Sequence, residues 1–162
     1  MAPNSSDAQL RESRVININR VAKVVKGGRR FSFSSLSVVG NRDGLVGIGY
    51  GKAKEVPSAV EKSVKDGKKR LMRVNLVEGT IPHQVEGVFC SSRVRLVPAS
   101  PGTGIIAGKA VRKVCEFAGI RDILTKNYGS TNALNVVKAT MVALSKLSDK
   151  RKIEELRGVN IE

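Results

Sequence analysis

The feature that most restricts the fold is a predicted β-strand in which every second residue is glycine. Within residues 45–51, Gly47, Gly49 and Gly51 share one face, whereas Val46 and Ile48 lie on the other. Bare backbone on a strand indicates that another element packs very close to it. The next segment supplies that element, because it has a proline at a favoured helix-start position followed by apolar residues at helical spacing. We predict a helix of about four turns, with the apolar stripe Val56, Val60, Val64, Gly67 and Leu71.

Two further strands are predicted before the glycine-rich one. Residues 14–25 alternate β-branched with polar side chains, and the alternation slips near Arg20 as a β-bulge would make it do. Residues 26–30 are predicted to be a loop, in which Gly27 and Gly28 allow positive φ and close approach to a ligand. A second strand over 31–39 and a hairpin connection over 40–44 follow. The first half is therefore β-β-β-α over residues 14–76, with its own core, after a flexible tail over residues 1–13.

The second half has a different pattern and does not repeat the first. Strands are predicted over 84–89 and 93–97, and a proline- and glycine-rich break over 98–104 follows. A helix over 110–118 ends at Gly119, a short strand covers 120–125, and Ser130 or Thr131 caps a last helix. This gives β-β-α-β-α over residues 77–148 and a frayed, charged tail over 149–162. The predicted fold class is α+β, with two small domains.

The charge distribution points to a polyanionic partner. The chain has 29 Lys and Arg against 14 Asp and Glu, a formal net charge of +15. No acidic residue lies between Glu12 and Asp43. Because solvated surfaces normally mix both signs, this window favours contact with nucleic acid. An acidic membrane surface is the alternative, but no amphipathic basic helix begins the chain. The cations of the window are Arg14, Arg20, Lys23, Lys26, Arg29, Arg30 and Arg42.

Several classes of protein are excluded by composition and spacing. No apolar run is long enough to cross a bilayer, and the first residues lack the pattern of a secretory signal. Cys90, Cys115 and His83 are too scattered for a zinc site, and two cysteines are too few for a disulfide framework. We therefore predict two reduced cysteines and no metal. The acidic residues are dispersed and no Gly-x-Ser-x-Gly motif occurs, so no catalytic residues are predicted.

One glycine-rich motif resembles a nucleotide-binding site and would argue against the prediction that the chain is not an enzyme. Residues 102–107 fit the dinucleotide pattern G-x-G-x-x-A, and Asp122 lies 20 residues beyond Gly102. However, prolines separate the glycines from the preceding strand, and too few residues follow to form a doubly wound sheet. Gly108 and Lys109 resemble the end of a phosphate-binding loop, but Ala110 takes the place of its hydroxyl residue. We predict no cofactor and no small-molecule substrate.

The remaining features of the sequence favour binding to folded RNA. The chain has six aromatic residues and no Trp, which is a weak basis for stacking on single-stranded bases. Cation-rich segments, glycine backbone and a basic helix instead suit recognition of phosphates and of RNA shape. Tyr50, beside Lys52, is the aromatic residue kept as a binding candidate.

Four blocks of sequence, in order, then resemble a known family. They are residues 20–33, 47–57, 102–108 and 128–132, and together they sample most of residues 14–145. The pattern is similar to that of the bacterial ribosomal protein S-five family. The resemblance implies a first domain like a double-stranded-RNA-binding domain without its first helix, and a second α/β domain. The sequence departs from common relatives at Cys90, at Lys109 and in its short charged C-terminus, which puts contacts of the tail in doubt.

The resemblance also implies a place and partners. The family is a structural constituent of the small ribosomal subunit, at the head–body junction by the mRNA entry. It contacts rRNA and ribosomal proteins S-four and S-eight, and supports translational accuracy and subunit assembly in a cytoplasmic or organellar ribosome. Gly104 and Arg112 match positions at the S-four interface. The segment matching the loop beside the spectinomycin site is Ala22, Lys23, Val24, Val25, Lys26, Gly27 and Gly28. The predicted rRNA-binding residues are Arg20, Lys23, Lys26, Gly27, Gly28, Arg29, Arg30, Gly49, Tyr50, Gly51, Lys52 and Lys54.

Two alternatives remain open at the level of sequence. A free regulator that binds double-stranded RNA outside the ribosome would have the same basic first half, and would bind generic duplexes without protein partners. The second half is also implied to share its fold with small-molecule kinases that have a phosphate-binding loop rich in proline and glycine. Because a fold does not fix a function, ATP binding would be needed to support the second alternative.

Overall fold

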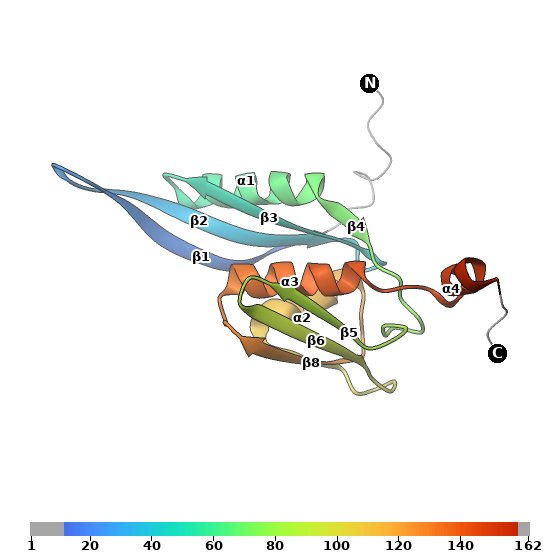
Figure 1. The fold of residues 1–162 in the computed structure, drawn as a ribbon. Coiled ribbons are helices and arrows are strands. Elements are labelled where there is room, and N and C mark those ends of the chain that lie inside the picture. Colours follow the sequence, from blue (N-terminus) through green and yellow to red (C-terminus); the bar gives the residue numbers. More distant parts are fainter. Residues whose placement is uncertain (1–11, 159–162) are drawn as a thin grey trace, which may run out of the picture.

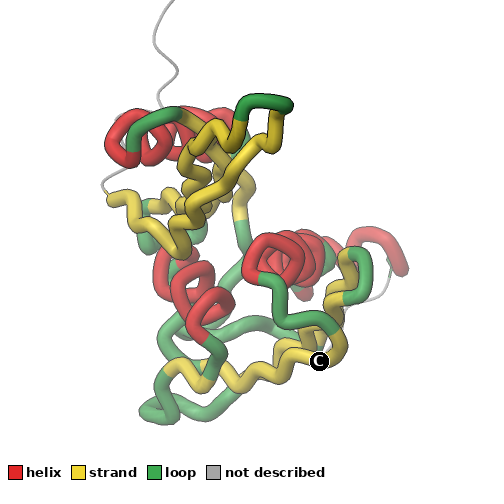
Figure 2. Tube along the Cα trace, turned by 90° about the vertical axis from the view of Figure 1, so that its left-hand side faces the viewer, coloured by secondary structure: helices red, strands yellow, loops and turns green. Residues whose placement is uncertain are grey.

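The protein consists of two four-stranded sheets with helices between and above them. The computed structural model describes residues 12–158, so most of the predicted N-terminal tail lies outside the described residues. Helix α1 covers the first sheet, and helices α2 and α3 lie between the two sheets (Figures 1 and 2). The observed architecture confirms the predicted α+β class.

The first sheet is antiparallel throughout. Its strands, in spatial order, are β1 (Glu12–Val25), β2 (Gly28–Gly40), β3 (Leu45–Ala53) and β4 (Leu71–Arg73). The helix predicted after β3 is α1 (Val56–Lys69), and it ends before Leu71, the last residue of the predicted apolar stripe. Residues 71–73 lie beyond the end of the helix and pair with residues 45–47 of β3. The prediction of a β-β-β-α unit therefore missed a fourth strand.

Two details of the β1–β2 hairpin differ from the prediction. The register shift lies between Val15 and Asn17, and pairing runs without interruption from Asn17 to Val25, so the predicted slip near Arg20 is wrong. Both faces are exposed near Arg20, and alternation there carries no information about register. The predicted five-residue loop is also wrong. Only two residues connect the strands, since Val25 pairs directly with Gly28.

The glycine face of β3 lies against α1, as predicted. A Cβ on Gly47 would lie 2.5 Å from the carbonyl oxygen of Gly67, and one on Gly49 would overlap that of Ser63. The buried residues of α1 are nevertheless Ala59, Ser63 and Gly67, and not the predicted stripe containing Val60 and Val64. Two backbones this close leave room only for small side chains, so the valines lie at the margins of the contact.

The second sheet has the order β5 (Val85–Phe89), β6 (Ser92–Pro98), β8 (Ile123–Gly129) and β7 (Ile105–Ile106). The sequence did not indicate strand β7, which pairs parallel to β8. Helix α2 (Lys109–Ala118) lies between the two strands in the sequence. The stop at Gly119 is confirmed, with a left-handed φ of 91° and an N–H that donates to the carbonyl of Glu116. Strand β8 begins and ends later than predicted.

The C-terminal elements differ from the prediction at their boundaries. Helix α3 (Ala133–Ser145) begins after Asn132, whose side chain accepts a hydrogen bond from the N–H of Leu134 at 3.0 Å, so neither Ser130 nor Thr131 is the cap. Helix α4 (Lys150–Arg157) occupies part of the segment predicted to fray. It ends at Gly158, where φ is 63°.

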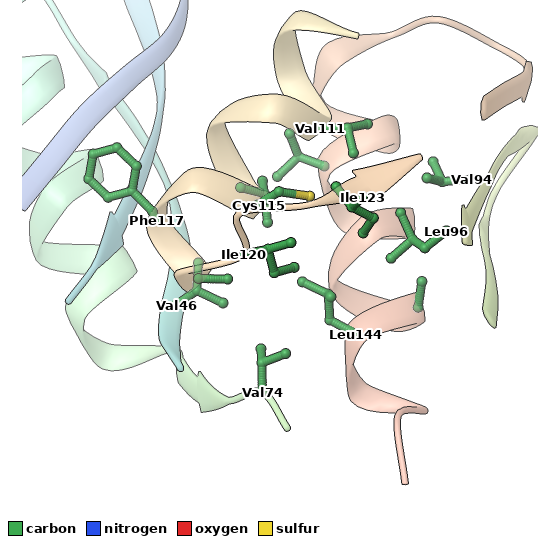
Figure 3. Packing of buried hydrophobic residues seen from close by; sticks show 14 of the residues in the cluster. Val46, Val74, Val94, Leu96, Val111, Cys115, Phe117, Ile120, Ile123 and Leu144 are labelled. Atoms are coloured by element: carbon green, nitrogen blue, oxygen red, sulfur yellow. The ribbon is translucent and has the colours of Figure 1, made fainter. Parts of the chain in front are cut away.

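The two halves share a hydrophobic core (Figure 3). Val46 and Val74 from the first half belong to the same buried cluster as Phe117 and Ile120 from the second. The backbone is joined too, since the N–H of Gly44 donates to the carbonyl of Ala118 at 2.9 Å. The prediction that the first half has its own core is therefore wrong: α1 covers one face of its sheet, and α2 covers the other. The boundaries 14–76 and 77–148 stay predictions.

Candidate nucleic-acid interface

A two-stranded arm is the most prominent surface feature. We define the hairpin arm as residues 19–34, the outer part of β1 and β2. It extends past α1 and away from the second half (Figure 1). Nearly every residue from 19 to 31 is exposed, because no helix packs on either face of this part of the ribbon. The segment 22–28 predicted as a loop is thus the end of β1, the two-residue turn of Lys26 and Gly27, and the start of β2.

The cations of the arm are divided between its two faces. In register, Arg20 lies opposite Phe33, and Lys23 lies opposite Arg30. Alternation then places Arg20 and Arg29 on the face continuous with the α1 side, and Lys23 and Arg30 on the other. Like charges directly opposite one another destabilise a strand pair. An anion bound between Lys23 and Arg30 would relieve this repulsion.

No Asp or Glu among the described residues forms an ion pair with a cation of the arm. Ion pairs among the described side chains join Arg42 to Glu12, Lys65 to Glu61, Arg70 to Asp66 and Arg93 to Glu86. None of them involves a cation of the arm. The contact recorded there is between cation and ring: the guanidinium of Arg20 lies 3.7 Å from the centre of the Phe31 ring. This stacking holds Arg20 in place and leaves its charge available to phosphate.

The glycines predicted to bind rRNA fall into two groups. Gly27 in the turn and Gly28 at the start of β2 are both exposed, and nothing lies within 4 Å of a Cβ added to either. Gly28 has a φ of 131°, which only glycine adopts without strain. Gly49 and Gly51 are buried beneath α1, so the absence of their side chains serves helix packing. Only the first pair is placed where backbone amides can approach an exposed ligand.

The end of β3 continues the basic surface. Tyr50 and Lys52 are exposed on the face of the sheet opposite to α1. The side chain of Tyr50 borders a small hollow together with Asn17, Asn19 and Asn132. Amide side chains of this kind both donate and accept hydrogen bonds, which suits sugar and phosphate groups. The sequence pattern gave no signal for the three asparagines, because they come together only in the folded chain.

The glycine motif of residues 102–107 has a structural role. The N–H of Gly104, where φ is 74°, donates to the carboxylate of Asp122 at 2.7 Å. The hydroxyl of Thr80 donates to the carbonyl of Asp122 at 2.6 Å. Asp122 is buried, so its carboxylate fixes the loop and does not face a ribose. Arg112 is exposed on α2, and these two predicted interface positions lie in the second half, apart from the arm.

The titratable groups of the second half are not arranged for catalysis. In the part of the chain that the structure describes, no three His, Cys, Asp or Glu residues come together as a metal site would need. Burial raises the pKa of the Cys115 thiol to about 12, so it is unreactive, whereas Cys90 is exposed. His83 accepts a hydrogen bond from the N–H of Ser148 at 3.2 Å, which joins the segment after α3 to the segment before β5.

Lys113 is a structural residue that the sequence did not reveal. Its ammonium crosses from α2 and donates to the carbonyl of Val15 at 2.5 Å, at the bulge that precedes the hairpin arm. Burial, followed by the nearby charges of Lys109 and Arg14, lowers the pKa of Lys113 from its ordinary value. The Val15 carbonyl lies beside the register shift of β1, and Lys113 binds it there.

The fold and the cation-rich arm define an α+β RNA-binding protein without a catalytic cluster among its described residues. None of the described helices is long and apolar enough to span a membrane. Comparison with known proteins identifies the family. Residues 11–75 match the family model "Ribosomal protein S5, N-terminal domain", and residues 87–157 match "Ribosomal protein S5, C-terminal domain". The small ribosomal subunit protein uS5 of Rhodopirellula baltica is 58% identical over 147 residues, which cover 91% of this chain and 83% of that protein.

The chain therefore belongs to the ribosomal protein S5 family. It is a structural constituent of the small ribosomal subunit and not an enzyme, as predicted. Membership implies rRNA and other ribosomal proteins as partners, while the contacts of individual residues stay predictions.

Proposed function

We propose that the protein uses its hairpin arm to bind small-subunit rRNA at the junction of head and body, near the mRNA entry. In this position it contacts ribosomal proteins S-four and S-eight and supports translational accuracy and subunit assembly. The observation that carries the proposal is the arm itself: an exposed ribbon of two strands with five cations, no acid and no covering element.

The arm has the chemistry of a phosphate-binding ribbon. Lys23 and Arg30 act on one face and Arg20 and Arg29 on the other, so the ribbon fits between two phosphate backbones. Lys26 extends from the turn, and the backbone of Gly27 lies open beside it. Binding of this kind releases counterions and weakens steeply as the salt concentration rises. In this arrangement residues 22–28 form the segment nearest the spectinomycin site.

The contact with S-four is proposed through Gly104 and Arg112. Gly104 precedes β7, and Arg112 lies on α2, the helix that also packs against the first sheet. The next residue along α2, Lys113, binds the carbonyl of Val15 in the part of β1 that leads into the arm. A displacement of α2 at the S-four interface would therefore be transmitted to the position of the arm, which is how the protein would influence decoding.

Charge reversal in the arm tests the proposal. In cells that supply both tagged and untagged copies, the double substitution Lys23→Glu and Lys26→Glu should lower incorporation into small subunits at least tenfold, measured by gradient sedimentation after a high-salt wash. The control is Arg73→Glu, an exposed cation in β4 at the far end of the same sheet. Thermal melts of the purified variants should match the wild type. Equal incorporation of both variants and an unchanged response to spectinomycin would contradict the proposal.

A further inference from the structure

Asn127 is a polar residue for which the fold alone gives no reason. It is partly buried on the same face of β8 as the core residue Ile123, whereas Tyr128 lies on the opposite face. The Oδ1 atom of Asn127 is buried and has no hydrogen-bond partner, and no hydrogen bond to its Nδ2 atom is found among the described residues. Leaving a buried amide unpaired lowers the stability of a protein, and an aliphatic side chain of similar size would avoid this cost.

Asn127 borders a pocket between the two halves of the molecule, with a volume of about 350 Å³. Strand β1 forms one wall, and the other walls come from the start of α2, the end of β8 and the start of α3. The aliphatic residues that line it are Ile16, Ala110, Ala133 and Val136, and the others are Asn17, Gly108, Lys109, Asn127 and Thr131. Aliphatic surface combined with a few polar groups is the usual composition of a small-ligand site.

The amide of Asn127 can offer both a donor and an acceptor to a group in this pocket. A Cβ built on Gly108 would lie 3.5 Å from the Nδ2 atom, and Gly108 itself lines the pocket. Rotation of the amide by half a turn exchanges the positions of Nδ2 and Oδ1, so either atom can be placed beside Gly108. An occupant that satisfies the amide therefore carries an N–H donor next to an acceptor.

Adenine has this pair of groups on one edge. An asparagine amide binds adenine through two hydrogen bonds, because Oδ1 accepts one from the N6 amine and Nδ2 donates one to N7. The flat faces of the base would pack against the aliphatic side chains of the pocket. Base-specific recognition of RNA uses unstacked bases of this kind, whose edges and faces are free.

Three cations lie together near the pocket, where the phosphate of a nucleotide would be. Lys109 lines the pocket. Burial, followed by the charges of Lys109 and Arg14, lowers the pKa of Lys113, and the charge of Glu116 opposes this shift. No ion pair found among the described side chains involves Lys109 or Arg14. A phosphate group bound here would reduce the repulsion among the three cations.

We propose that the pocket between the halves binds an unstacked adenine nucleotide, with Asn127 selecting the base and Lys109 binding the phosphate. The chemistry is the same for an adenosine of rRNA and for a free adenine nucleotide. The inference deepens the proposed binding of rRNA and rests on it for the source of the nucleotide, but it uses no residue of the hairpin arm.

Titration of the purified protein with AMP tests the pocket directly. The NMR signals of the Asn127 side-chain amide and of the Gly108 N–H should both shift. IMP has an oxygen in place of the N6 amine, so it should bind about tenfold more weakly, because Oδ1 then has no donor. Equal affinities for AMP and IMP, or the absence of a shift in these two signals, would overturn the proposal.

Substitution of Asn127 distinguishes a binding role from a structural one. Asn127→Leu should raise the melting temperature, because it removes an unpaired amide, and lower the affinity for AMP about tenfold. Tyr128→Leu, on the opposite face of β8, is the matched control and should leave AMP binding unchanged. A lower melting temperature with unchanged AMP affinity would place Asn127 in the fold alone and reject the proposal.

Lys109→Gln tests the role of the phosphate. It should weaken the binding of AMP but not that of adenosine, which has no phosphate. An equal loss for both ligands, or no loss for either, would refute the assignment of Lys109.

Chemical probing of assembled small subunits identifies the source of the nucleotide. Diethyl pyrocarbonate reacts at N7 of unstacked adenines. If rRNA supplies the base, one adenine should become more reactive in subunits that contain Asn127→Leu and not in those that contain Tyr128→Leu. If no adenine changes while AMP still binds the pocket, the ligand is a free nucleotide. The arm variant Lys23→Glu with Lys26→Glu should retain AMP binding, so that a failure of the arm and a failure of the pocket are observed separately.

Discussion

At the scale of single residues, the glycines of β3 illustrate how a missing side chain can specify packing. A Cβ on Gly49 would overlap the carbonyl of Ser63, and both partners are backbone, which cannot rotate away. Gly49→Ala should therefore destabilise the protein by about 3 kcal/mol or more, beyond the ordinary cost of overpacking. Urea denaturation would measure the change. A loss below about 0.5 kcal/mol, the usual range for surface substitutions, would show that α1 moves away without cost.

Substitutions at Gly27 and Gly28 can distinguish a glycine that is needed for function from one that is needed for the fold. Nothing lies near a Cβ added to Gly27, so Gly27→Ala should leave the stability within about 0.5 kcal/mol of the wild type. It should still reduce incorporation into small subunits, because the added methyl group would hold rRNA away from the backbone. Gly28→Ala should cost about 1 kcal/mol or more, since φ is 131° there. Normal incorporation of Gly27→Ala would argue against close approach of rRNA at the turn.

The buried thiol of Cys115 predicts a dependence of stability on pH. Its pKa rises from an ordinary 9.0 to about 12 in the folded protein, because burial disfavours the thiolate. Below pH 9 the thiol is protonated in both states and contributes nothing. Between pH 9 and 12 only the unfolded chain loses the proton, so stability falls as pH rises. In a Cys90→Ser background, Cys115→Ala should flatten this fall between pH 8.5 and 10.5, and equal slopes with and without Cys115 would refute the assignment.

At the scale of elements, the contact between α1 and the sheet depends on small polar residues. The hydroxyls of Ser37 and Ser63 lie 2.6 Å apart, and that of Ser63 also approaches the carbonyl of Val60 at 2.7 Å. Ser63→Val would remove these hydrogen bonds and add bulk where the backbones of α1 and β3 meet. We expect a loss of about 2–4 kcal/mol in urea denaturation. Lys65→Ala, on the exposed side of the same helix, is the control, and similar losses would contradict this account.

The sequence predicted elements well and their contacts less well. The glycine alternation of β3 identified a closely packed helix, because few other arrangements tolerate bare backbone. The face that α1 presents was wrong, since hydrophobicity marks Val60 while the closeness of the backbones selects Ser63 and Ala59. Short strands such as β7 have no periodicity of their own and depend on their neighbours. In the candidate interface, the basic window was visible in the sequence, whereas the Asn17, Asn19 and Asn132 cluster and the Lys113 contact arise only from folding.

At the scale of the whole molecule, the shared core predicts that both halves unfold together. Calorimetry should show one transition, with equal calorimetric and van't Hoff enthalpies. Phe117→Ala, at the contact between the halves, should cost about 3–5 kcal/mol and shift that transition as a whole. Phe31→Ala, in the exposed arm, should cost about 1 kcal/mol at most, through loss of the contact with Arg20. Two separate transitions, with only one moved by Phe117→Ala, would show that the halves are independent.

A small change of angle at the bulge between Val15 and Asn17 moves the tip of the hairpin by a large distance. The nine residues from Asn17 to Val25 reach about 30 Å beyond it, at about 3.3 Å per residue. Such a length acts as a lever: a tilt of about 5° at its base displaces the tip by about 3 Å, the length of a hydrogen bond. Lys113, which binds the Val15 carbonyl beside this bulge, thus lies where a small movement has the largest effect at the tip.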